Sequence, residues 1–136
     1  MKVAITQETS LPQEKSAIIN RLSDAFEEFF NKKSYGLGVE EIYIGVITVK
    51  PEFDFFFKTR KPKYDRKANS LSFDVKMDFN TVDSANVNEI PSLVVSQIIE
   101  ALTAISKIPD FEKDHFEKDL NSFINDSPGL QAISLN

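Results

Sequence analysis

Alternating apolar and polar residues mark the clearest strand of this chain, between Leu71 and Phe79. The apolar side chains occupy every second position: Leu71, Phe73, Val75, Met77 and Phe79. A period of two residues places the two sets of side chains on opposite faces of a strand. We therefore expect a strand with one face in the core and the other face in water.

A second β-rich segment runs from Val39 to Lys50, where β-branched and aromatic residues place apolar groups on both faces. This pattern is typical of a strand that is buried on both sides. Pro51 interrupts the segment, so the aromatic run from Phe53 to Lys58 is either a further strand or the same strand bent at a bulge. Residues 58–69 then form the turn into the Leu71–Phe79 strand. We expect an antiparallel meander, with Met1–Thr6 as an additional strand at its edge.

Three other segments repeat apolar residues at helical spacing. The first begins near Leu11, behind a capping box formed by Ser10 and Gln13, and its apolar stripe comprises Ile18, Leu22, Phe26, Phe29 and Phe30. The second runs from Pro91 to about Lys107, after the polar stretch 81–89. The third follows Asp110 as its cap and ends at residues 127–129; its inward side comprises Phe116, Leu120, Phe123 and Ile124.

This order of elements predicts an α+β fold: an antiparallel meander of three to four strands with one N-terminal helix and two C-terminal helices packed on it. The chain has 136 residues and shows no repeat, low-complexity tract or internal boundary. A chain of this length buries roughly two-thirds of the surface that its unfolded state exposes. We therefore expect residues 1–136 to form a single domain with its own core.

The amino-acid composition limits the cellular compartment and the kinds of chemistry that we expect of this chain. The chain has no cysteine, which excludes disulfides, thiolate nucleophiles and thiolate-bound zinc and fits a reducing compartment. Its N-terminus becomes polar too early for the apolar region of a signal peptide. No apolar run approaches the roughly 20 residues that span a bilayer. These features predict a soluble cytoplasmic protein without a membrane partner.

The formal net charge is −5, and the charges are unevenly distributed. Residues 1–49 carry −2, residues 50–67 carry +4 and residues 68–136 carry −7. An acidic body is poorly suited to nucleic acid, whose phosphates dominate binding, and it is better suited to a basic protein partner. An acidic surface also keeps proteins soluble without any partner, so the charge alone does not choose between these interpretations.

No residue pattern in the chain points to a catalytic, metal or cofactor site. The only histidine, His115, precedes Asp119 by four residues, and a metal site would need at least one further ligand. Residues 78–89 match several ligand positions of an EF-hand loop, but Val82 and Asp83 stand where an oxygen ligand and a glycine are required. We predict no catalytic residues, no metal and no cofactor, and therefore a protein that is not an enzyme. Carboxylate chemistry is the enzymatic class that the residue inventory leaves open.

Two charged surfaces are candidates for binding a partner. The first is an acidic face on the polar side of the Leu71–Phe79 strand and on the third helix: Asp74, Asp78, Asp110, Glu112, Asp114 and Glu117. The second is a basic tip between two strands: Lys58, Arg60, Lys61, Lys63 and Tyr64. Such a tip can bind a phosphate or an acidic protein, although charged residues at hairpin tips also block unwanted edge pairing.

The aromatic run leaves a different function open. The rings of this run either belong to the core or line a pocket: Phe53, Phe55, Phe56 and Phe57. In the second case the chain would be a small-ligand or effector-binding α+β domain, in which an aromatic-lined pocket holds the ligand.

Five short motifs lie in order between residues 35 and 125: Tyr35–Gly38, Phe53–Lys58, Arg60–Tyr64, Asp74–Phe79 and Ile108–Phe111. In this order the chain resembles a family of bacterial immunity proteins that are encoded beside polymorphic toxins. The resemblance implies a small cytoplasmic protein that binds one cognate toxin domain and neutralises it by occlusion, without catalysis. Many toxin domains are basic nucleases, and an acidic inhibitor would imitate the phosphate charge of their substrate and associate rapidly.

Overall fold

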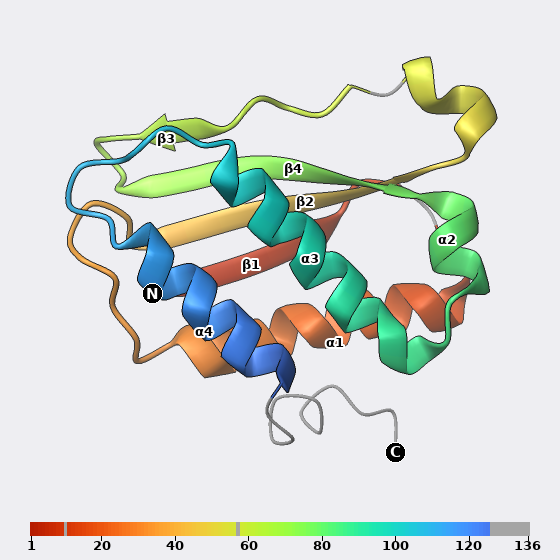
Figure 1. The fold of residues 1–136 in the computed structure, drawn as a ribbon, viewed down its shortest axis with the longest axis horizontal. Coiled ribbons are helices and arrows are strands. Elements are labelled where there is room, and N and C mark those ends of the chain that lie inside the picture. The colour runs from red at the N-terminus through yellow and green to blue at the C-terminus, as the bar shows by residue number, and fades with distance from the viewer. Residues whose placement is uncertain (10, 57, 126–136) are drawn as a thin grey trace.

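The computed structural model describes residues 1–9, 11–56 and 58–125, and it has the predicted α+β composition (Figure 1). The strands are β1 (Lys2–Gln7), β2 (Glu41–Val49), β3 (Lys63–Asp65) and β4 (Ser70–Asp78). The α-helices are α1 (Gln13–Phe30), α2 (Phe79–Ser84), α3 (Ile90–Thr103) and α4 (Lys113–Asn125). Two short 3₁₀ helices, η1 (Pro51–Phe56) and η2 (Val87–Glu89), complete the order. No helix among the described residues has the length and the apolar content required to cross a membrane.

The four strands form one sheet in the order β1-β2-β4-β3, so the predicted edge strand at the N-terminus is confirmed. The predicted meander is wrong, because β1, β2 and β4 are parallel and only β3 is antiparallel to its neighbour. Helix α1 carries the chain back between β1 and β2 (Figure 1). Residues 58–62 return along the outer edge of β4 before that strand begins (Figure 1). Both neighbours of β2 therefore start at the same end as β2 and run in its direction.

Residues 53–56 of the aromatic run do not form the predicted strand. Pro51–Phe56 forms η1, in which the Phe53 N–H donates to the Lys50 carbonyl at 2.9 Å. Pro51 has no N–H to offer to a sheet ladder, so the chain turns at the end of β2. The residues of η1 are exposed at one corner of the molecule, and the position beside β4 is taken by the residues that follow.

The core lies between the sheet and helices α1, α3 and α4, which cover one face of the sheet (Figure 1). Four of the five alternating residues of β4 are buried in it, as predicted: Leu71, Phe73, Val75 and Met77. Phe79 differs, because it is the first residue of α2 and is only partly buried. Asp78 caps this helix by accepting the N–H of Thr81 at 3.1 Å, which ends the strand one residue early. The polar stretch that follows Phe79 thus contains α2 and η2.

The helix boundaries differ from the prediction at several ends. Ser10 of the predicted capping box and the predicted stop at residues 127–129 lie outside the described residues. Helix α3 ends at Thr103, four residues before the predicted end at Lys107. Asp110 is not the cap of α4: it lies three residues before the helix, with a left-handed φ of +58°.

Asp110 belongs instead to a joint between two loops, residues 35–38 and 108–112. Its carbonyl accepts the N–H of Gly38 at 2.9 Å, and Glu112 N–H donates to the carbonyl of Tyr35 at 2.7 Å. A Cβ atom on Gly36 would lie 2.1 Å from the Asp110 carbonyl oxygen, and one on Gly38 would lie 2.1 Å from that of Pro109. Two of the five sequence motifs are therefore the two halves of one structural contact.

Candidate functional site

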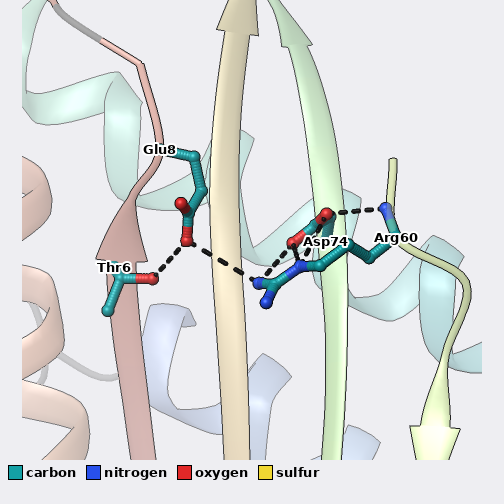
Figure 2. A network of polar contacts seen from close by, with 4 residues as sticks. All are labelled: Thr6, Glu8, Arg60 and Asp74. Carbon is teal, nitrogen blue, oxygen red and sulfur yellow. Dashed lines mark hydrogen bonds and ion pairs between the residues drawn. The ribbon is translucent and has the colours of Figure 1, made fainter. Parts of the chain in front are cut away.

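A polar network crosses the sheet face that the helices leave open (Figure 2). The Thr6 hydroxyl donates to Glu8 Oε1 at 3.0 Å, and the same oxygen lies 3.6 Å from Arg60 Nη2. Arg60 in turn binds Asp74 of β4, so the network runs from β1 to the far edge of β4. Gly45 of β2 lies beneath it, where a Cβ atom would be 2.4 Å from Asp74 Oδ1 and 2.8 Å from Arg60 Nη2. The missing side chain of Gly45 leaves the space that the ion pair occupies.

Asp74 is not the water-facing carboxylate that the alternating pattern predicted, because its side chain is only 2% exposed. Arg60 Nη2 and Nε donate to its Oδ1 at 2.7 and 2.9 Å, and the backbone N–H of Arg60 donates to its Oδ2 at 2.6 Å. Hydrogen bonding to Asp74 is the main cause that raises the pKa of the Arg60 guanidinium, and the opposite charge adds to it. The pair also fastens residues 58–62 to the edge of the sheet. Asp74 therefore holds the fold together at this face, and its charge is already neutralised.

Three exposed phenylalanines lie on η1, and we call them the η1 aromatic cluster: Phe53, Phe55 and Phe56. Phe55 and Phe56 are 74% and 68% exposed, and their ring centroids are 3.9 Å apart. Phe53 is 48% exposed. Rings that line a ligand pocket would be buried, so the structure does not place these three side chains around a pocket. Phe57 lies outside the described residues.

The other predicted acidic residues are distributed over different parts of the molecule. Asp78 lies at the end of β4, whereas Asp110, Glu112 and Asp114 are exposed at and before the start of α4 (Figure 1). Glu117 is partly buried, and its Oε1 atom is buried with no hydrogen-bond partner among the described residues. The six residues therefore do not make one acidic face, and the exposed group that the structure brings together is the one before and at the start of α4.

The predicted basic tip is an extended edge segment rather than a hairpin tip. Lys58, Lys61 and Lys63 are exposed along it, while Arg60 is turned over the sheet. The Tyr64 hydroxyl donates to the Gly38 carbonyl at 2.7 Å and so serves the fold. The turn between β3 and β4 comes later, at residues 66–69.

His115 lies on α4 between two carboxylates, Glu112 at 3.8 Å from Nδ1 and Asp119 at 3.7 Å from Nε2. These contacts are on opposite sides of the imidazole ring and do not converge on one point. Asp119 of the same helix is half-buried and accepts a hydrogen bond from the hydroxyl of the buried Tyr35 at 2.5 Å. Burial first, and then Asp119, raise the pKa of Tyr35. Within the described ranges, no group of three or more His, Asp or Glu side chains is arranged to hold a metal ion.

The sequence patterns did not point to Thr6, Glu8 and Gly45 as parts of the open-face network. An isolated glycine inside a strand pattern indicates a close approach by another group, so Gly45 carried a usable signal. Glu8 and Arg60 are separated by more than fifty residues, and no local sequence pattern indicated that they lie close together.

One of the three comparisons with known proteins found a match. Neither the curated proteins nor the solved structures include a match to this chain. A family model described as Immunity protein 44 matches residues 1–126, which include every helix and strand of the described structure. The resemblance to immunity proteins is thereby confirmed, and the chain belongs to the Immunity protein 44 family.

Proposed function

We propose that this protein neutralises one cognate toxin domain by binding it directly and occluding its active site, without catalysing a reaction. The match to a family of immunity proteins over residues 1–126 is the observation that carries this proposal, because a role in immunity suggests neutralisation of a toxin. Inhibition by occlusion needs a stable scaffold and a complementary surface, and it needs no reactive group on the inhibitor. The buried core and the pinned open face of the sheet supply such a scaffold.

The partner in this proposal is a basic toxin domain, for which a nuclease is the leading candidate. The chain has a net charge of −5, and residues 68–136 alone carry −7. Exposed carboxylates at Asp110, Glu112 and Asp114 lie close together before and at the start of α4. Complementary charge accelerates encounter and orients the partners, and its effect falls as salt rises. Asp78 can contribute to the same field from the end of β4, whereas Asp74 contributes little because Arg60 neutralises it.

The proposal is tested with the toxin domain encoded beside this chain. Co-expression should rescue growth, and the purified proteins should form a one-to-one complex whose association slows as salt rises. Reversing Glu112 and Asp114 to lysine should lower the association rate by about tenfold at low salt, with little change in the free energy of unfolding. The matched control reverses Glu27 and Glu28, which are exposed on α1 and produce the same change in net charge.

Equal loss of association in both double variants would mean that total charge, and not this group on α4, steers the toxin. If the intact chain neither binds nor protects against the adjacent toxin, the proposed function itself is wrong.

A further inference from the structure

The rings of the η1 aromatic cluster are exposed in the folded protein. Phe55 and Phe56 are 74% and 68% exposed, so they add little to the core. Aromatic side chains are enriched at the centres of protein interfaces, where a few of them supply most of the binding free energy. Three exposed rings on one short helix therefore make a candidate for such an anchor.

The cluster is also held in place before any partner binds. Lys76 of β4 forms an ion pair with Asp54 of η1 at 2.8 Å, and its ammonium group also donates to the Asp54 carbonyl at 3.2 Å. On the other side of η1, the Arg60–Asp74 pair fastens the following segment to the sheet. An anchor whose backbone is fixed loses less conformational entropy on binding.

The charges around the cluster indicate which surface it fits. Asp54 is paired with Lys76, and the ammonium group of Lys50 lies 5.2 Å from the centre of the Phe79 ring. Asp54 and Lys50 are thus engaged within the protein, whereas Glu52 on the same short helix is exposed. The rings themselves fit a surface that is apolar and not charged. It needs an apolar recess that accepts two adjoining, tilted rings. A lipid bilayer fits poorly, because insertion of the rings would draw the carboxylates of Glu52 and Asp54 into the membrane.

We infer that the η1 aromatic cluster is the anchor of the toxin interface and inserts into an apolar recess on the toxin domain. This inference rests on the proposed function and assigns the short-range contact, whereas the acidic residues of α4 act at long range. The two contributions separate kinetically: loss of an anchor raises the dissociation rate, and loss of a steering charge lowers the association rate.

The test uses the full chain and the catalytically inactivated toxin domain encoded beside it, in a surface-binding or stopped-flow measurement. The variant Phe55→Ser with Phe56→Ser removes only exposed rings. Its expected effect is an increase of about 30-fold or more in Kd, almost entirely in the dissociation rate, with an unchanged salt dependence of association. The matched control is Leu37→Ser, because Leu37 is 77% exposed and lies in the loop after α1, at the other end of the molecule. It should bind the toxin domain like the wild type.

Three results would overturn the inference while leaving the proposed function intact. The first is wild-type affinity of the double variant. The second is an equal loss in Leu37→Ser, which would make the effect a general one of surface apolarity. The third is a wild-type dimer that the double variant dissociates without a change in toxin binding, which would make a second copy of the chain the occupant. Absence of binding by the wild type itself would instead reject the proposed function.

Discussion

Replacing Arg60 with methionine tests how the open face of the sheet is held together. Arg60→Met keeps a long side chain over Gly45 but removes the guanidinium donors of Asp74, whose side chain is 2% exposed. The carboxylate then keeps one hydrogen bond, from the backbone N–H of residue 60, which is 2.6 Å long in the native protein. Loss of one partner from a buried ion pair costs about 3–5 kcal/mol, whereas loss of an exposed pair costs about 0–1 kcal/mol. The cost therefore reports whether Asp74 is desolvated.

We expect the lower end of the buried range, about 3 kcal/mol, because the Arg60 side chain is itself 62% exposed. Asp74→Asn should cost only about 1–2 kcal/mol, since the amide oxygen still accepts a hydrogen bond and the guanidinium can turn to water. The double variant contains no buried charge. Its cost should fall below the sum of the single variants by roughly 1–2 kcal/mol.

Urea unfolding followed by circular dichroism measures these differences. With a slope of about 1–3 kcal/mol per molar urea, a loss of about 3 kcal/mol moves the midpoint by roughly 1–3 M. Lys63→Met is the matched control, since Lys63 is an exposed basic residue of the same edge, and it should change stability by less than about 0.5 kcal/mol. A cost below about 1 kcal/mol for Arg60→Met, or strict additivity in the double variant, would refute the reasoning.

Two further substitutions test the packing around α4. Gly38→Ala should lower the free energy of unfolding, measured in urea, by about 1–3 kcal/mol, because the new Cβ atom would lie 2.1 Å from the backbone oxygen of Pro109. Unchanged stability would show that the two loops of the joint move apart to accept the methyl group. Tyr35→Phe should cost about 1.5–3 kcal/mol at neutral pH through the lost hydrogen bond to Asp119. Because the pKa of Tyr35 is raised in the folded protein, its contribution is complete below the unfolded pKa of about 10 and is lost as pH rises above it. Unfolding between pH 8 and pH 11 should thus show a steeper alkaline loss for wild type than for the variant, and equal slopes would contradict this.

The periodicity of the apolar residues was sufficient to predict the elements that bury one face and expose the other. The alternation from Leu71 to Met77 identified β4 and its buried face, and the stripe from Ile18 to Phe30 identified α1, since burial follows the geometric repeat of the backbone. The α+β class follows from the order of these elements. The short helix α2 was missed although Asp78 is a residue type that favours helix N-caps, because a period-two pattern extended through Phe79.

The sequence by itself therefore determined the class of the fold, most of its helices and strands, and the family that its motifs resemble. Only the tertiary structure decided strand direction, because a period of two residues reports which face is buried and not which neighbour lies alongside. It also decided the state of Asp74, whose strand position is polar but whose carboxylate is covered by Arg60, fourteen residues earlier in the chain. The tertiary structure also decided the exposure of Phe55 and Phe56. An aromatic residue is buried only if its segment joins the core, and here residues 58–65 occupy the edge of β4.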